Sequence, residues 1–466
     1  MADADVANRT QAITTSGRGS RAALAVVLMT QLLIAINVAV VNVGLTGIQH
    51  DLGYSAATLS WVVNAYLLAY GGLLIVGGRL GDLVGRRRTL VFGLAVFLLA
   101  VVVAALFPPL LIVARAMQGA GAALASPSVL AVITHLYDGP ARSRALGWFS
   151  VVTGMGMSAG MIFGGIVVQF LTWQWIFILD IPLTAALVIL SRIFVPAIRP
   201  ERRAKLDLLG AALATISALA LVFGFVELAA NVAIEPDWVV SFAVGVAALV
   251  LLVMHLRRAA NPLLPVALFR NPARVGAFVA NGLIGAAMTG IIFFLSQFFG
   301  GTLHLAPLAI GAAFLLWTIP QLPSALTVGR IITRFGTRPV MYVATALILA
   351  GLILLIPLGS YTSVNAALVV GMILIGLGVG ATFFSINLTV MSSVEPSIAG
   401  GASGMLQTAL QLGGSVGIAI LVLAEGLGGL TAVMSTAAGF IAISILALSL
   451  RTRRPAARAV TGESAR

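Results

Sequence analysis

Long apolar stretches separated by short polar segments dominate the chain. Runs with almost no charged residue predict membrane spans at about 22–46, 57–78, 89–107, 109–134, 145–170, 175–195, 207–228, 238–256, 273–299, 306–328, 338–358, 363–392, 398–424 and 428–450. These runs approach or exceed the roughly 20 residues that a helix needs to cross a bilayer. The pattern therefore predicts an all-α polytopic membrane protein with about fourteen spans.

The composition agrees with a chain that lies in a bilayer. Of its 466 residues, 60% are hydrophobic and only 9% are charged, whereas soluble domains carry roughly 25% charged residues. The absence of cysteine excludes disulfides and thiolate metal sites. The histidines fall at predicted span ends and form no cluster, so we expect no metal site and no cofactor; they are His50, His135, His255 and His304.

The basic residues predict the orientation of the chain. If the N-terminus is cytoplasmic and the chain crosses the membrane fourteen times, all of the 27 basic residues except one fall in the predicted cytoplasmic segments. The exception is Arg115, which lies inside a span. Positive residues are retained on that side during insertion. We therefore expect both termini in the cytoplasm and the protein in the plasma or inner membrane. The net charge of +13 then reflects topology and lipid headgroups, and nucleic-acid binding is not expected.

The order of the spans predicts two halves. A disordered cytoplasmic tail (1–21) precedes a six-helix bundle (22–195), an inserted helix pair (207–257), a second six-helix bundle (273–450) and a cytoplasmic basic tail (451–466). The segment "GRLGDLVGRRR" (78–88) is echoed by "GRIITRFGTRP" (329–339) between the tenth and eleventh spans. In this echo Thr333 stands at the place of Asp82. A repeated half with a repeated inner loop is typical of a transporter.

The first of these loops contains an acidic residue, Asp82, beside its arginines. One alternative is a tight turn, with glycines for the bend and arginines that hold it on the inner side. That alternative does not explain Asp82, since a carboxylate contributes little to orientation. A carboxylate is stabilised at a helix N-terminus, and we expect Asp82 to contact the start of the thirteenth span, near 399–404. The predicted conformational latch comprises Gly78, Arg79, Gly81, Asp82, Gly85, Arg86 and Arg87.

At these residues the sequence resembles the major facilitator superfamily. "GRLGDLVGRRR" is similar to the signature inner loop of that family, and the fourteen spans narrow the resemblance to its drug:proton antiporter branch. Further similar stretches are "WVVNAYLLAYGGLLIVGGRLGD" (61–82), "LLIVARAMQGAGAALASPS" (110–128), "WQWIFILDIPL" (173–183) and "ANPLLPVALFRN" (260–271). The resemblance implies two six-helix bundles plus an inserted helix pair, and proton-driven export of amphipathic drugs.

Three positions depart from what the branch usually has. Asn37 stands where the branch has Asp, Asp180 where it commonly has Asn, and Met161 where the fifth helix has a proline. The proline is thought to help antiporters seal against ion leak, so Met161 leaves open whether antiport is strict. The fifth helix keeps a small-residue face that lets helices approach closely; its glycines are Gly156, Gly160 and Gly164.

A proton-driven exporter needs a titratable group within its spans. Asn37 cannot titrate, which leaves Asp180 as the first candidate and Glu227 as the second. Arg115 lies inside a span, where a charge is costly unless it is paired or wet, and Gln118 follows it by one turn. The alternatives are that Arg115 extends to an interface and that Asp180 and Glu227 are solvated helix ends.

Polar residues in the spans are candidates for a substrate cavity. They are Asn37, Asn64, Tyr66, Gln118, Asn281, Gln297, Asn387 and Gln411, and each can instead serve helix packing. No phosphate-binding loop is present, so a gradient has to drive transport. We expect a monomer that lies in the lipid bilayer and exports a small amphipathic drug or antibiotic across it in exchange for protons. The alternatives are export of an endogenous metabolite or lipid-like molecule, and a non-transport membrane enzyme.

Overall fold

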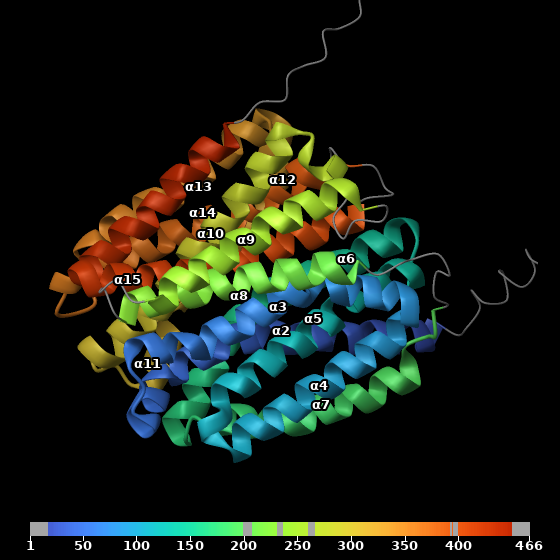
Figure 1. The fold of residues 1–466 in the computed structure, drawn as a ribbon, viewed down its shortest axis with the longest axis horizontal. Helices are drawn as coiled ribbons and strands as arrows, with labels where there is room; N and C mark the ends of the chain where they lie inside the picture. The colour runs from blue at the N-terminus through green and yellow to red at the C-terminus, as the bar shows by residue number, and fades with distance from the viewer. Residues whose placement is uncertain are drawn as a thin grey trace, which may run out of the picture.

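The computed structural model describes residues 17–198, 207–230, 236–259, 266–391, 394 and 399–449. These ranges are helices joined by short turns, with no β-strand among them (Figure 1). The helices run roughly along one direction, as expected for segments that cross a bilayer together.

Six long helices form the N-terminal part. They are α2 (Gly17–Leu52), α3 (Ala56–Val84), α4 (Arg86–Leu106), α5 (Leu111–Leu136), α6 (Gly139–Phe170) and α7 (Trp175–Phe194), with a short 3₁₀ helix, η1 (Pro108–Leu110), before α5. Helix α5 packs against both α3 and α4, α2 packs against α6, and α4 packs against α7. Residues 17–21, predicted as tail, are helical, and the Tyr137 hydroxyl donates to the Ser20 carbonyl there.

Two further helices link this part to the C-terminal one. Helices α8 (Leu208–Ala230) and α9 (Pro236–Arg258) pack against each other, and α8 also packs against α3 and α15. They lie where the sequence analysis expects the inserted pair, at 207–257. The Ser217 hydroxyl of α8 donates to the Gly245 carbonyl of α9 at 2.9 Å, inside their contact.

The C-terminal part begins after the short helix η2 (Val266–Phe269). Its elements are α10 (Pro272–Gln297), the π-helical turn η3 (Phe298–Thr302), α11 (Pro307–Ala313), α12 (Leu315–Phe335), α13 (Thr337–Leu355), η4 (Ile356–Ser360), α14 (Ala366–Met391) and α15 (Ala399–Leu448). The backbone of α15 is non-helical at Gly428 and Gly429, and Gly429 has a φ of 63°. This kink separates the two segments predicted as the thirteenth and fourteenth spans.

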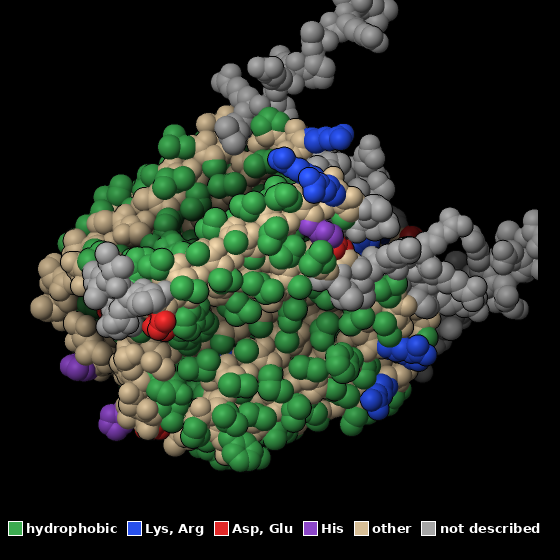
Figure 2. Space-filling model, in the orientation of Figure 1, with side chains coloured by type: hydrophobic (Ala, Val, Ile, Leu, Met, Phe, Trp, Pro, Cys, Tyr) green, Lys and Arg blue, Asp and Glu red, His purple; other side chains and the backbone are tan. Residues whose placement is uncertain are grey.

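The helices have the length and the surface of membrane spans. Eleven of the described helical segments are long and apolar enough to cross a bilayer, and two shorter apolar stretches lie in α6 and α8. Since the kinked α15 counts once among the eleven, this inventory is compatible with fourteen crossings. Figure 2 shows apolar side chains over most of one face, with its Lys and Arg side chains toward the right-hand edge.

The predicted charged loop is largely helical. Helix α3 continues to Val84, and Gly85, with a φ of 104°, both ends α3 and precedes α4. Gly78, Arg79, Gly81 and Asp82 therefore belong to the last turns of α3. A turn of one residue is possible because glycine tolerates a positive φ at little cost.

A buried polar cluster as the candidate functional site

Five polar side chains from four helices lie inside the N-terminal part. Asn37 comes from α2, Tyr66 from α3, Arg115 and Gln118 from α5, and Asp180 from α7. Asp180 is 5% exposed and the other four are fully buried. Burial of charged groups is costly unless they are paired and hydrogen-bonded, so the contacts within this polar cluster decide what it can do.

Arg115 is held by hydrogen bonds to three helices. Its Nε donates to the Val62 carbonyl at 2.9 Å, Nη1 to Gln118 Oε1 at 2.9 Å, and Nη2 to the Asn37 carbonyl at 3.3 Å. The guanidinium also lies 4.3 Å from the centre of the Tyr66 ring, in a cation–π arrangement. The side chain is therefore enclosed by helices and does not extend to the protein surface.

Close packing of α3 on α5 allows the Arg115 guanidinium to contact the backbone of α3. A Cβ atom placed on Gly119 would overlap the Tyr66 carbonyl oxygen, so α3 can approach α5 this closely only at a glycine. Arg115 lies one turn before Gly119 on α5, which puts its guanidinium against the backbone of α3. The glycine thus positions the charged side chain.

Asn37 connects the arginine to the acid. Its Nδ2 donates to the Leu33 carbonyl at 3.0 Å, and its Oδ1 accepts from Gln118 Nε2 at 3.3 Å. The Asn37 side chain also hydrogen-bonds the Asp180 carboxyl, and the charges of Asp180 and Arg115 interact. The two positions at which the sequence departs from the branch in opposite directions are therefore neighbours in space.

One carboxyl oxygen of Asp180 remains unpaired. Asp180 Oδ2 is buried and has no hydrogen-bond partner in the described part of the chain. A carboxyl group with one paired and one unpaired oxygen can take up a proton on the unpaired one. Such a proton would remove the negative charge that attracts Arg115.

Other predicted cavity residues lie at helix contacts. Asn64 of α3 accepts from the Ser415 hydroxyl of α15 at 3.4 Å, a contact between the N- and C-terminal helices. Gln411 packs against Gly71 at the same α3–α15 contact. Asn281 Nδ2 donates to the Leu406 carbonyl at 2.7 Å, which joins α10 to α15.

Three predicted site residues do not join the polar cluster. Gln297 lies at the end of α10, and its Nε2 is buried without a partner among the described residues. Asn387 is exposed, and its Nδ2 donates to the Phe383 carbonyl one turn earlier. Glu227 lies on α8, a helix that contributes no residue to the cluster.

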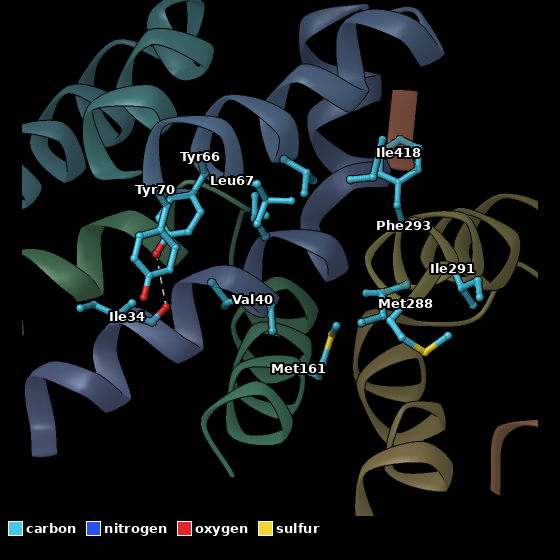
Figure 3. Packing of buried hydrophobic residues seen from close by; sticks show 14 of the residues in the cluster. Ile34, Val40, Tyr66, Leu67, Tyr70, Met161, Met288, Ile291, Phe293 and Ile418 are labelled. Carbon is cyan, nitrogen blue, oxygen red and sulfur yellow. Dashed lines mark hydrogen bonds between the residues drawn. The ribbon is translucent and has the colours of Figure 1, made fainter. Parts of the chain in front are cut away.

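The sequence analysis missed a second chain of polar side chains, formed by Tyr70, Ser126 and Gln31. The Tyr70 hydroxyl donates to Ser126 Oγ at 3.1 Å, and Ser126 Oγ donates to Gln31 Oε1 at 3.5 Å. Tyr70 also hydrogen-bonds Gln407 of α15. Figure 3 shows the ring of Tyr70 beside that of Tyr66. The available signal was the spacing of four residues, which puts both tyrosines on one face of α3.

The charged turn between α3 and α4 is internally bonded. Arg86 Nη1 donates to the Gly78 carbonyl at 3.1 Å, across the turn, and a Cβ atom on Gly81 would lie 2.9 Å from the Arg86 guanidinium. Arg79 and Arg87 are half-buried. The side chain of Asp82 and those of residues 399–401, its predicted partners, lie outside what the structure describes.

The glycine face of α6 lies against α2. Cβ atoms on Gly156, Gly160 and Gly164 would fall within 2.8 Å of α2 atoms. Met161, at the position where the branch has a proline, is buried, and its carbonyl faces Gly311 of α11. Helix α6 thus meets α2 on one side and the C-terminal part on the other.

Comparison with known proteins identifies the family. The family model described as Major Facilitator Superfamily matches residues 27–273 and 277–466. The puromycin resistance protein of Streptomyces alboniger is 35% identical over 404 residues, covering 85% of this chain and 80% of that protein. The cephamycin export protein of Amycolatopsis lactamdurans is 34% identical, covering 91% and 89%. A multidrug efflux pump of Mycolicibacterium smegmatis is 32% identical, covering 86% and 79%.

Solved structures agree on the fold. A crystal structure of a peptide transporter superposes with a TM-score of 0.68, at 15% identity, over 91% of this chain and 93% of that one. The human organic anion transporter MFSD10 superposes with a TM-score of 0.61, at 17% identity, over 92% and 99%. The predicted resemblance is confirmed by a family match over almost the whole length and by relatives above 30% identity, and the chain belongs to the major facilitator superfamily of membrane transporters.

Proposed function

We propose that this protein is a secondary active transporter that exports amphipathic drugs or antibiotics in exchange for protons. The relatives named for puromycin, cephamycin and multidrug efflux support the substrate class. The observation that carries the coupling is the buried cluster in which Asn37 joins the Asp180 carboxyl to Arg115. Because the family is one of transporters, the membrane-enzyme alternative is not supported.

Proton entry acts on the contacts of Asp180. A proton taken up on Oδ2 removes the charge that faces Arg115 and weakens the carboxyl as an acceptor for Asn37. Asn37, Arg115 and Asp180 lie on α2, α5 and α7, so the change alters how these three helices hold together. Release of the proton on the opposite side restores the contacts. The protein alternates access by this linkage of protonation to helix packing.

The two halves touch near one end of the molecule, and these contacts open and close as access alternates. A Cβ atom on Gly300 would lie 2.6 Å from the Thr46 hydroxyl, and one on Gly165 would lie 2.9 Å from the Pro307 carbonyl. These contacts join α2 to η3 and α6 to the start of α11, at ends that the arginine pattern predicts to be outside. Residues 22–195 and 273–450 are proposed as the two moving bodies, with 207–257 as the inserted pair.

Neutral or weakly charged substrates fit best. Within the spans acidic residues are few, which argues against a dedicated pump for dications. An endogenous metabolite or a lipid-like molecule is the second candidate, because such a molecule can also be neutral or weakly charged. A panel of toxic compounds tested on a pump-deficient host separates the two candidates. Resistance to several unrelated drugs supports drug export, and resistance to none contradicts it.

Transport by the purified protein tests the coupling. In proteoliposomes, we expect efflux of a drug found in that panel to require an imposed pH gradient. Efflux that ignores the gradient would show a uniporter or another coupling ion. A matched sodium gradient without a pH difference is the control that identifies the second case.

The orientation is proposed from the arginine pattern and can be measured directly. The natural chain has no cysteine, so single cysteines can be introduced without background. Cysteines at Ala4, Ala204 and Ala456 should react only from the cytoplasm, and one at Ala233 only from outside; these positions lie outside the described residues. Labelling of position 233 from the inside would contradict the fourteen-span topology.

A further inference from the structure

A groove with a charged rim lies between the start of α4 and the end of α7. Its volume is about 480 Å³. Its lining consists of Arg87, Arg88, Val91, Phe92 and Ala95 from α4 and Arg192 from α7. Figure 2 shows Lys and Arg side chains at its lower right, where Figure 1 places the ends of α4 and α7. Three guanidinium groups thus converge on one surface groove.

The charge in this groove is not balanced within the described chain. Arg87 is half-buried and Arg88 and Arg192 are exposed, and no described residue pairs with any of the three. Orientation by positive residues explains why arginines lie at this end of the helices. It does not explain why arginines from two helices line the same groove.

The start of α4 adds to the attraction for an anion. The N-cap residue Gly85 has no side chain to accept hydrogen bonds, and the first turn contains no acidic residue. The first N–H groups of a helix lack partners within the helix, and an anion beside them is stabilised. The groove therefore favours a negatively charged group by its arginines and by the helix that carries two of them.

The wall of the groove and the surface beside it are apolar. Phe92 is 57% exposed on α4, and Ile189 and Ile193 are 56% and 64% exposed on α7. Side chains of this kind on a membrane span face lipid tails. A charged rim that continues into an apolar surface matches a molecule with an anionic head and a hydrocarbon tail.

We infer that this groove binds an anionic phospholipid, with its phosphate between Arg87, Arg88 and Arg192 and an acyl chain along Phe92. On the side predicted to be cytoplasmic, the occupant is a lipid of the inner leaflet. The arginines come from both helices, so the lipid bridges α4 to α7 and stabilises their contact. This site is separate from the buried cluster and does not depend on the transported substrate.

Lipid titration of the purified, delipidated protein tests the inference. We expect native mass spectrometry to show phosphatidylglycerol bound in preference to phosphatidylcholine, and Tm to rise with phosphatidylglycerol. Since each basic residue near an anionic membrane surface contributes about 1 kcal/mol, the variant Arg88→Gln/Arg192→Gln should bind phosphatidylglycerol roughly 10- to 30-fold more weakly.

A matched variant separates this groove from general positive charge. Arg257→Gln/Arg258→Gln removes two exposed arginines from the end of α9, at the same predicted side of the membrane, and should leave the lipid preference unchanged. Equal loss in both variants would overturn the site, as would equal binding of the two lipids by the unmodified protein. Two further probes, inorganic phosphate and glycerol 3-phosphate, carry the anionic group without the acyl chains. If either raises the Tm as much as phosphatidylglycerol does, the groove binds a free anion and the assignment to a lipid is wrong.

Discussion

The carboxylate of the buried cluster stands on α7, beside an asparagine on α2. Asn37 and Asp180 depart from the branch in opposite directions, and the structure joins their side chains by a hydrogen bond. At positions 37 and 180 the cluster therefore has one amide and one acid, exchanged between the two helices relative to what the branch usually has. At the residue scale this exchange supplies a titratable group for the proposed proton coupling, although position 37 cannot titrate.

Exchanging the two residues back tests this explanation. Asp180→Asn alone should abolish efflux driven by a pH gradient while downhill substrate exchange continues, because the helices still move but no group carries the proton. The double variant Asn37→Asp/Asp180→Asn should recover gradient-driven efflux, since a carboxyl again lies beside Arg115. Both are measured in proteoliposomes with an imposed gradient.

Glu227→Gln serves as the comparison for that experiment. Glu227 lies on α8, outside the cluster, so its loss should leave driven efflux near the level of the unmodified protein. Undiminished efflux by Asp180→Asn would place the coupling group elsewhere. A double variant as inactive as Asp180→Asn would show that position 37 cannot take over the role.

The sequence identified individual charged residues but not the side chains that they contact. Arg115 and Asp180 were found because charges inside apolar spans are costly and rare. Their connection through Asn37 depends on how α2, α5 and α7 pack, which no local pattern contains. Tyr70 was missed because a tyrosine in a span is compatible with apolar packing, and only its contacts with Ser126 and Gln407 show a polar role.

At the scale of helices, small residues determine which elements approach closely. The glycine face of α6 was predicted from glycine spacing within the family resemblance, whereas its partner α2 was not, since the sequence gives no pairing between spans. The helix boundaries also differ from the apolar runs: α3 extends to Val84 through the charged segment. Polar residues continue a helix beyond the bilayer, so hydropathy marks the spans and not the helix ends.

Adding a methyl group to this face should destabilise the protein. A Cβ atom on Gly160 would lie 2.8 Å from the Ile36 carbonyl oxygen, and a backbone atom can yield only if α2 and α6 separate. We expect Gly160→Ala to cost roughly 1–3 kcal/mol, as overpacking does, and to lower the Tm in detergent.

The same change elsewhere on α6 provides the control. Gly147 has open space around its Cβ position, so Gly147→Ala should be neutral or stabilise the helix by up to about 1 kcal/mol. Equal Tm values for the two variants would mean that the α2–α6 contact adjusts without cost.

The turn between α3 and α4 carries the predicted latch. We expect Asp82→Asn to lower transport strongly while insertion and substrate binding persist, because the carboxylate acts on the equilibrium between conformations. Transport and equilibrium binding of the same drug are the two measurements. Thr333→Asn, at the equivalent place of the second half, removes no carboxylate and should transport normally. Normal transport by Asp82→Asn would show that the turn has no latch.

At the scale of the whole molecule, the N- and C-terminal helices meet through α3 and α15, α6 and α11, and α2 and η3. The two halves were predicted from the sequence echo, and the inserted pair from the resemblance to the family. The conformation was not predictable, because both access states share one sequence and differ only in which contacts between the halves are closed. The Thr46–Gly300 contact is closed here, at the predicted outer end.

Cross-linking this contact should stop transport. The Cβ position of Gly300 lies 3.5 Å from Thr46 Cβ, within the range that a disulfide spans, so Thr46→Cys/Gly300→Cys should oxidise readily. The bond would hold the outer end shut, and alternating access requires that end to open. We expect oxidation to abolish efflux and a reductant to restore it, while each single cysteine variant transports equally under both conditions. Full transport by the oxidised double variant, with the bond verified by mass spectrometry, would show that the halves do not separate here and that access to the outer side opens along another contact.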